Sequence, residues 1–279
     1  MPKILRRQQL SDLVFRLTVE APEIAAKHKA GQFIILRISE KGERIPLTIA
    51  DSDADKGTID LIVQAVGKTT RMLSGMKEGD EILDLLGPLG VPTHIADVKH
   101  AVMIGGGVGG APLYPICKAY KKAGCKITVI LGARNESLLV LEKEFTEIAD
   151  RIIIATDDGS KGIKGQVTTA LQQMIDAGET VEEVVAIGPL IMMKFVALLT
   201  KKYNIPTTVS LNPLMVDGTG MCCGCRVKVG NEIKFACVHG PEFDGLKVDF
   251  DSLLRRSGRY KHEEKCRLDS YIEETKNNG

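Results

Sequence analysis

Five glycines in six residues, Gly105 to Gly110 with Val108 among them, follow the short apolar stretch 101–104 and open a helical stretch that reaches about residue 123. A glycine turn between a strand and a helix lets the backbone approach a phosphate, and the helix N-terminus supplies free N–H groups and positive charge. Such turns also form only to fit tight geometry. The motif therefore makes Gly106, Gly107 and Gly109 candidate nucleotide contacts and leaves the structural alternative open.

The residues after this turn alternate between two patterns. Short apolar stretches predict strands at 127–131, 151–155, 184–187 and 207–209, and helical stretches near 138–149, 166–177 and 189–202 separate them. Strands that alternate with helices indicate a parallel sheet covered on both faces. The sequence therefore predicts an α/β nucleotide-binding domain over residues 99–210.

Loops at the carboxyl ends of these predicted strands carry further candidate contacts, because open α/β sheets bind ligands at that edge. Arg134 places a cation where an adenosine ribose or phosphate would lie. The later loops add Asp157, Asp158, Gly188, Pro189 and Met192. These are also ordinary loop residues, but four such loops at one edge favour binding. Arg134 suits the 2′-phosphate of NADP, whereas Asp157 repels it. These residues therefore do not decide whether the nucleotide is NAD or NADP.

Residues 1–98 follow a different pattern, rich in short β-branched stretches at 13–19, 32–38 and 59–66. Gly, Pro, Asp and charged clusters bound these stretches, which predicts several strands in a barrel or sandwich. A β-rich domain followed by an α/β domain resembles the ferredoxin–NADP reductase superfamily over nearly the whole chain.

This resemblance implies an antiparallel barrel that holds FAD through an Arg-x-x-Ser/Thr motif; the stretch from Arg44 to Thr48 resembles it, with one additional residue between the arginine and the threonine. It implies that Arg44 meets the FAD pyrophosphate, which suits a bidentate guanidinium. The residues expected along the flavin are Pro46, Leu47, Thr48, Val63 and Gln64. A second phosphate loop is expected at Gly67, Lys68, Thr69 and Thr70.

Four of the seven cysteines fall between Cys222 and Cys237, a grouping that indicates a metal site in a reducing cytoplasm rather than disulfides. The spacing is D-x4-C-x2-C-x11-C, and plant-type [2Fe–2S] sites use C-x4-C-x2-C followed by a distant Cys. Cys222, Cys225 and Cys237 thus take three ligand positions, and Asp217 stands where the first Cys would be. A carboxylate is a harder ligand than a thiolate, so the cluster potential should differ from that of an all-Cys site.

Three alternatives to this ligand set remain open. Cys223 is a possible fourth ligand, although adjacent residues seldom both reach one compact cluster. Asp217 is also interpretable as a turn residue. A Cys3His zinc site from the three cysteines and His239 is the competing metal site, and it would fit a non-enzymatic, zinc-stabilised binding protein.

The cysteine arrangement after FAD and NAD domains is similar to that of the dihydroorotate dehydrogenase electron-transfer subunits and their relatives. With Asp217 and the run 237–251, the chain is most similar to the small-subunit family of NADH-dependent reduced ferredoxin:NADP oxidoreductases, sometimes labelled sulfide dehydrogenase beta subunits. This resemblance implies an electron-bifurcating heterodimer with a larger iron–sulfur flavoprotein subunit, in which FAD, a [2Fe–2S] cluster and NAD(H) act together. No catalytic side chain is expected. An electron-transfer subunit of dihydroorotate dehydrogenase is the alternative.

Composition excludes other classes of function. The net charge of +1 argues against bulk binding to nucleic acid or anionic membrane, and no apolar run reaches the roughly 18–20 residues of a membrane span. The N-terminus lacks the apolar region of a signal peptide, so a cytoplasmic location is expected. The predicted organisation is an FAD-binding barrel over 1–98, the NAD-binding domain over 99–210, and a [2Fe–2S] domain with a C-terminal tail over 211–279.

Overall fold

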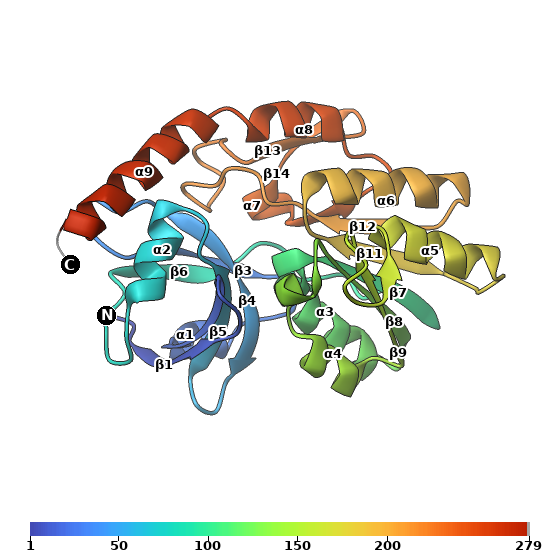
Figure 1. The fold of residues 1–279 in the computed structure, drawn as a ribbon, viewed down its shortest axis with the longest axis horizontal. Coiled ribbons are helices and arrows are strands. Elements are labelled where there is room, and N and C mark those ends of the chain that lie inside the picture. The colour runs from blue at the N-terminus through green and yellow to red at the C-terminus, as the bar shows by residue number, and fades with distance from the viewer. Residues whose placement is uncertain (278–279) are drawn as a thin grey trace.

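The computed structural model describes residues 1–277. An antiparallel barrel and a mostly parallel sheet lie side by side, and the C-terminal helices cross over both (Figure 1). Alternating strands and helices after residue 99 and β-branched stretches before it account for this division, in agreement with the predicted fold class.

The barrel is built from six strands in the order β1-β2-β5-β4-β3-β6. Apolar and polar residues alternate along β2, so that Phe15, Leu17 and Val19 fill the interior. An isolated bridge pairs Lys3, just before β1, with Glu81, just before β6. This bridge connects the two edges of the sheet and closes the barrel. The elements are β1 (Ile4–Gln9), β2 (Val14–Glu20), α1 (Pro22–Ala25), β3 (Phe33–Arg37), β4 (Ile45–Asp53), β5 (Thr58–Gln64), α2 (Lys68–Gly75) and β6 (Asp84–Leu89).

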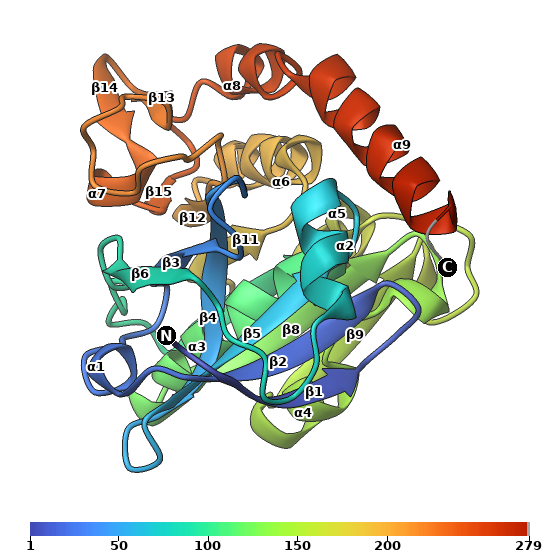
Figure 2. The ribbon, with the colours of Figure 1, turned by 90° about the vertical axis from the view of Figure 1, so that its left-hand side faces the viewer.

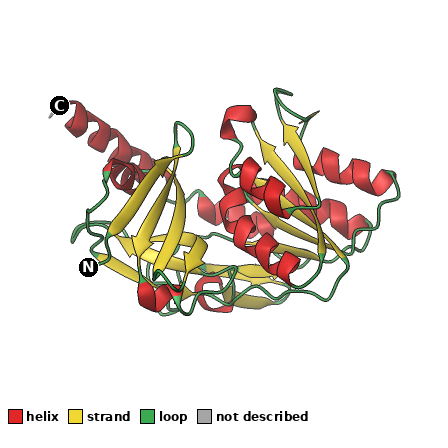
Figure 3. Ribbon diagram, turned by 90° about the horizontal axis from the view of Figure 1, so that it is seen from below, coloured by secondary structure: helices red, strands yellow, loops and turns green. Residues whose placement is uncertain are grey.

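The second sheet has the order β10-β9-β8-β7-β11-β12-β15, with all strands parallel except the edge strand β15. Figure 3 shows helices on both faces. The elements up to β12 are β7 (His100–Gly106), η1 (Gly107–Gly109), α3 (Gly110–Lys122), β8 (Lys126–Ala133), η2 (Glu136–Leu138), α4 (Glu142–Ile148), β9 (Arg151–Thr156), β10 (Ile163–Lys164), α5 (Val167–Asp176), β11 (Glu183–Ile187), α6 (Leu190–Lys202) and β12 (Thr207–Ser210).

Side chains of β7 alternate between the two faces of this sheet. Ala101 and Met103 pack in a core with α3 and α4, whereas Val102 and Ile104 pack in a core with α5 and α6. Both faces of a parallel sheet are thereby buried, which explains why its strands are almost continuously apolar.

The C-terminal segment forms a hairpin, two short elements and two helices. They are β13 (Arg226–Val229), β14 (Glu232–Phe235), α7 (Ala236–His239), β15 (Glu242–Asp244), α8 (Phe250–Ser257) and α9 (Lys261–Asn277). Gly230, at a φ of +58°, makes the predicted turn between β13 and β14. Helix α9 runs from α8 back to α2 of the barrel (Figure 2).

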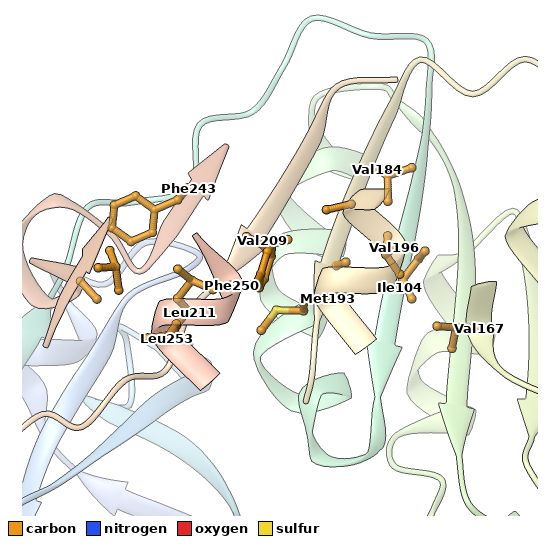
Figure 4. Close-up of a cluster of buried hydrophobic side chains, with 14 of the residues drawn as sticks. Ile104, Val167, Val184, Met193, Val196, Val209, Leu211, Phe243, Phe250 and Leu253 are labelled. Carbon is orange, nitrogen blue, oxygen red and sulfur yellow. The ribbon is translucent and has the colours of Figure 1, made fainter. Parts of the chain in front are cut away.

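One apolar core joins the C-terminal segment to the parallel sheet. Phe243, Phe250 and Leu253 pack with Val209, Leu211 and the α6 residues Met193 and Val196 (Figure 4). The same core includes Cys225, Cys237 and the barrel residues Phe33 and Ile35. The cysteine segment is therefore packed against both larger parts of the molecule. The predicted domain boundaries at residues 98 and 210 remain predictions.

Edge strand β15 was not predicted from the sequence. Its three residues pair antiparallel with β12, so the sheet is not wholly parallel. Within residues 1–277, no helix is long and apolar enough to cross a membrane.

Candidate functional site

A cavity of about 1080 Å³ lies between the barrel and the parallel sheet. The barrel contributes β4, β5 and the start of α2, and the sheet contributes the carboxyl ends of β7, β8, β9 and β11. A cavity of this size fits extended ligands such as dinucleotides, and it lies at the sheet edge where open α/β folds bind them.

Most of the predicted cofactor-binding residues line this cavity. They are Pro46, Leu47, Thr48, Val63, Gln64, Thr70, Gly106, Gly107, Gly109, Arg134, Asp157, Gly188, Pro189 and Met192. Residues that do not line it are Arg44, Gly67, Lys68, Thr69 and Asp158. The structure thus brings the larger set together, and the individual contacts with cofactors remain predictions.

Hydroxyl groups at the start of α2 already have partners within the protein. The backbone N–H of Gly67 donates to Thr70 Oγ1 at 3.0 Å, which caps the helix. Thr69 donates its hydroxyl to the carboxylate of Glu43, next to Arg44. A phosphate at this helix end would therefore meet chiefly backbone N–H groups and the helix dipole.

Packing constrains two of the three candidate glycines at the β7–α3 turn, Gly109 against rigid backbone and Gly106 against the flexible end of Met192. A Cβ on Gly109 would lie 2.3 Å from the backbone oxygen of Ile187, and one on Gly106 would lie 2.4 Å from Met192 Sδ. Gly107, by contrast, has a φ of +54° and open space around its Cα. Gly107 is thus the position where the backbone is open to a ligand, and its neighbours hold the turn against the β11–α6 loop.

Asp158 lies in a turn rather than in the cavity wall. Its carboxylate accepts a hydrogen bond from the backbone N–H of Ser160 at 2.9 Å, and this contact lowers its pKa. Asp157 and Arg134, in contrast, line the cavity at the ends of β9 and β8. These two side chains carry opposite charges at the adenosine end predicted from the sequence.

Lining residues at the end of β12 and in the segment after it were not predicted from the sequence. Ser210, Leu211, Asn212 and Met215 all face the cavity. Ser210 ends the last parallel strand, at the same edge as the predicted loops, which is the signal that would have identified it. This segment leads from the cavity directly to Asp217 and the cysteines.

Two of the predicted cluster ligands come together beyond this segment. Cys225 Sγ and Cys237 Sγ are 3.2 Å apart and buried, whereas Cys222 is exposed and is near enough only to add a small effect to the pKa of Cys237. Burial and the neighbouring Cys225 raise the pKa of Cys237 to about 12. Thiols in such surroundings become thiolates when a metal binds, so the donor set suits an iron–sulfur cluster.

Asp217 is held in a turn by three donors. Its Oδ2 accepts from Thr219 N at 3.0 Å, from Thr219 Oγ1 at 2.6 Å and from Met221 N at 3.2 Å. These bonds, with a smaller effect from Arg44, lower the pKa of Asp217 and keep it ionised. All three use Oδ2, so Oδ1 is left to act as a ligand. Both interpretations of Asp217, turn residue and ligand, are therefore compatible.

The loop that carries Asp217 packs directly on the barrel. Gly218 has a φ of +85°, and a Cβ there would lie 2.7 Å from Ile35 Cγ1 and 2.8 Å from Leu89 Cδ1. The loop can approach β3 and β6 this closely only because residue 218 is glycine.

His239, the fourth ligand of the alternative zinc site, has other partners in the structure. His239 Nδ1 accepts a hydrogen bond from the backbone N–H of Phe235 at 2.9 Å, and its ring stacks on Phe235. Across residues 1–277, no group of three or more His, Cys, Asp or Glu side chains closes around a single-ion position. A binuclear cluster spreads its ligands over two irons and needs no such point. The Cys3His zinc site therefore gains no support.

Polar contacts tie the barrel to the other parts of the molecule. Lys118 of α3 pairs with Asp51 of β4 at 2.8 Å, and Thr93 donates to Glu242 Oε1 of β15 at 2.7 Å. Burial raises the pKa of Glu242 to about 7, with a smaller effect from Glu183. The parts that surround the cavity are thus held together by paired polar groups.

Three family models match the chain in succession. Residues 4–94 match an oxidoreductase FAD-binding domain, and residues 103–198 match an oxidoreductase NAD-binding domain. Residues 212–249 match the iron–sulfur cluster binding domain of dihydroorotate dehydrogenase B. The chain therefore contains binding domains for FAD, NAD and an iron–sulfur cluster.

Relatives cover nearly the whole chain. A homolog of the dihydroorotate dehydrogenase B (NAD(+)) electron transfer subunit from Thermotoga maritima is 47% identical over 270 residues, which cover 97% of this chain and 95% of the relative. The corresponding electron transfer subunit of Desulforamulus reducens is 33% identical over 255 residues, covering 88% and 96%.

Solved structures agree with these relatives. A chain from the structure of an NADH-dependent reduced ferredoxin–NADP oxidoreductase, studied for flavin-based electron bifurcation, is 46% identical with a TM-score of 0.92 and 98% coverage of both chains. A ferredoxin NADP+ reductase from Neisseria gonorrhoeae, 19% identical with a TM-score of 0.61, covers 72% of this chain and 89% of its own, and shares the fold alone.

Proposed function

The chain belongs to the family of dihydroorotate dehydrogenase B electron-transfer subunits and their homologues, and from this membership we propose that it passes electrons between NAD(H) and a larger partner subunit. It is an oxidoreductase subunit with FAD-, NAD- and iron–sulfur-binding domains. One observation carries the proposal: the segment from Ser210 to Met215 lines the cavity and leads into the cysteine loop. With both cofactors bound, this segment would connect the cavity to the cluster-binding loop.

Within the cavity, each side of the wall is proposed to hold one cofactor. FAD would lie along Pro46, Leu47 and Thr48 of β4, with its pyrophosphate toward the start of α2 and Arg44. The nicotinamide nucleotide would lie over the open backbone of Gly107 on the opposite wall. When bound, FAD supplies the conversion between a two-electron hydride donor and the single electrons that iron–sulfur clusters carry.

Side chains at the cavity position and insulate the cofactors rather than transfer protons. The wall is mostly apolar, and among the described residues its ionisable side chains are Arg134 and Asp157, both at the predicted adenosine end. Hydride transfer requires closeness and alignment, which the packed glycine turn and the β11–α6 loop provide. No catalytic side chain is therefore assigned.

The proposed cluster ligands are Asp217, Cys222, Cys225 and Cys237. Support comes from the contact between the Cys225 and Cys237 thiols, the lowered pKa of Asp217, and its Oδ1, which accepts no hydrogen bond from the described residues. Cys223 is the weaker candidate, because its Sγ is directed at the backbone oxygens of Gly220 and Met221, 3.9 and 3.8 Å away.

We further propose that the partner is the larger iron–sulfur flavoprotein subunit of an electron-bifurcating NADH-dependent reduced ferredoxin:NADP oxidoreductase. A homolog of the dihydroorotate dehydrogenase B electron transfer subunit is 47% identical, so identity alone does not separate the two partners, but the 46% identity to a chain of that enzyme, over 98% of both chains, is consistent with this assignment. Asp217 in place of a cysteine favours the same assignment.

Reconstitution with two large subunits tests this proposal. The chain would be mixed with the large subunit of an NADH-dependent reduced ferredoxin–NADP oxidoreductase or with the catalytic subunit of a dihydroorotate dehydrogenase B. We expect NADP+ reduction that requires both NADH and reduced ferredoxin in the first mixture. NADH production from dihydroorotate in the second mixture alone would assign the chain to the other partner.

A further inference from the structure

A second, smaller cavity of about 120 Å³ lies beside the cysteine loop, between that loop and the junction of α8 with α9. Cys222 and Gly224 form one wall, and Arg226, Arg256, Arg259 and Tyr260 lie around it. We call this cavity the arginine pocket. Among the residues that the structure describes, no acidic side chain lines it.

The positive charge of the arginine pocket is not balanced within residues 1–277. None of its three arginines lies within 4.0 Å of a carboxylate, whereas ion pairs are common elsewhere on the surface. Arg256 is held by a 3.0 Å hydrogen bond from Nη2 to the backbone oxygen of Gly224. Three gathered guanidinium groups repel one another, so the arrangement favours an anionic ligand, and carboxylates match the guanidinium fork.

Apolar side chains around the arginine pocket indicate that this anion belongs to a protein. Leu214 is 51% exposed and Tyr260 is 46% exposed, and Met221, which directly precedes Cys222 in the chain, is 84% exposed. Arg, Tyr and Met are enriched at protein–protein interfaces, and desolvated arginine and aromatic anchors often dominate their energy. A free inorganic anion would need none of these apolar groups.

The arginine pocket lies next to the proposed cluster ligands. Cys222, the exposed member of the proposed ligand set, forms part of its wall. The segments that line it, α8 and the α8–α9 junction, lie beyond the matched iron–sulfur domain, which ends at residue 249. The C-terminal extension thus builds a charged recess beside the cluster-binding domain.

We propose that the arginine pocket is the docking surface for the partner subunit, which places an acidic segment against Arg226 and Arg259 and an apolar contact over Leu214 and Met221. This inference rests on the proposed function, because it locates where electrons leave the cluster for the partner. The docked segment brings the partner next to Cys222.

Charge reversal of two arginines tests the docking surface. The variant R226E/R259E leaves the bond from Arg256 to Gly224 in place but removes the 3.5 Å bond from Arg226 Nη1 to the backbone oxygen of Cys223, so the iron content of each variant is measured. The variant R226Q/R259Q serves if the reversed pair does not fold. The matched control is K122E/K126E, because both lysines are exposed in the NAD-binding domain, away from the arginine pocket, and the change in charge is the same. The probe is the purified large subunit of an NADH-dependent reduced ferredoxin–NADP oxidoreductase.

We expect the Kd for this large subunit to rise at least tenfold in the arginine variant and less than twofold in the lysine control, since close interfacial charge pairs are strongly coupled. The affinity of the wild-type chain should also fall with added salt more steeply than that of the arginine variant. Equal affinity of the two variants, or no binding by the wild-type chain, would overturn the proposal. Binding of millimolar phosphate to the arginine pocket, with no effect on the affinity of the large subunit, would also overturn it.

Reduction of each variant by NADH, without the partner, is followed on the same samples. The arginine variant should keep its iron and flavin content and should be reduced like the wild-type chain. If NADH does not reduce the wild-type chain, the proposed function is refuted instead. Failure of the docking surface and failure of the proposed function are therefore distinguishable.

Discussion

Gly218 offers a direct perturbation of the contact between the cysteine loop and the barrel. Its φ of +85° lies in the left-handed region, and an added Cβ would lie 2.7 Å from Ile35 Cγ1 and 2.8 Å from Leu89 Cδ1. Ile35 is almost fully buried and branched at Cβ, so it cannot turn aside easily. The substitution Gly218→Ala should therefore displace the loop that carries Asp217.

The expected cost has two parts. A left-handed alanine costs about 1–2 kcal/mol, and overpacking against a filled core costs a further 1–3 kcal/mol or so. Gly230→Ala is the matched control, because Gly230 has a φ of +58° with no atom within 4 Å of the added Cβ. The difference between the two variants, about 1–3 kcal/mol, corresponds to a factor of roughly 5–150 in loop opening.

The assay is the first-order rate of iron loss to a chelator under anaerobic conditions. Gly218→Ala should lose iron roughly 5–150 times faster than Gly230→Ala, while both variants keep their FAD. Equal rates in the two variants would refute the reasoning, because the loop would then not depend on its contact with Ile35 and Leu89.

Three further predictions follow from other parts of the structure. Asp157→Asn removes a negative charge from the cavity wall and should raise the kcat/KM ratio of NADPH to NADH about tenfold, and an unchanged ratio would contradict the placement of the ribose there. Ending the chain at Tyr260 removes α9, the helix that contacts α2 and carries the half-buried Tyr271 and Ile272. This truncation should raise the Kd for FAD about tenfold in a fluorescence titration. An unchanged Kd would show that α9 does not support the FAD site through α2. Because burial raises the pKa of Glu242 from 4.5 to about 7, the folded protein binds that proton more tightly than the unfolded chain, so stability falls as pH rises between those values. Glu242→Gln should remove this loss of about 3 kcal/mol in unfolding curves compared at pH 5 and pH 8, and an identical pH dependence in both proteins would contradict it.

Local sequence patterns were sufficient for the main architecture. The switch from β-branched stretches to alternating strands and helices near residue 100 predicts the two sheets, and the cysteine spacing includes Cys225 and Cys237, whose thiols lie 3.2 Å apart. Such patterns succeed because strand and helix periodicity depends on near neighbours in the chain.

Contacts between distant segments could not be predicted in this way. Strand β15 has only three residues, and its pairing with β12 depends on a chain reversal more than 30 residues long. The roles of Gly106 and Gly109 in packing against the β11–α6 loop, and the bond from Thr69 to Glu43, likewise depend on tertiary contacts. The arginine pocket joins residues from the hairpin and from the α8–α9 junction, which have no local signal in common.

Reduction by NADH tests the central claim most directly. The chain, purified anaerobically and assayed for iron, zinc and flavin, would be mixed with NADH and followed by visible absorption and EPR spectroscopy. The account predicts that flavin bands bleach and that a rhombic signal of a reduced [2Fe–2S] cluster appears in near-stoichiometric amount. A colourless protein that holds stoichiometric zinc, or a flavoprotein whose cluster stays oxidised in the presence of NADH, would contradict it.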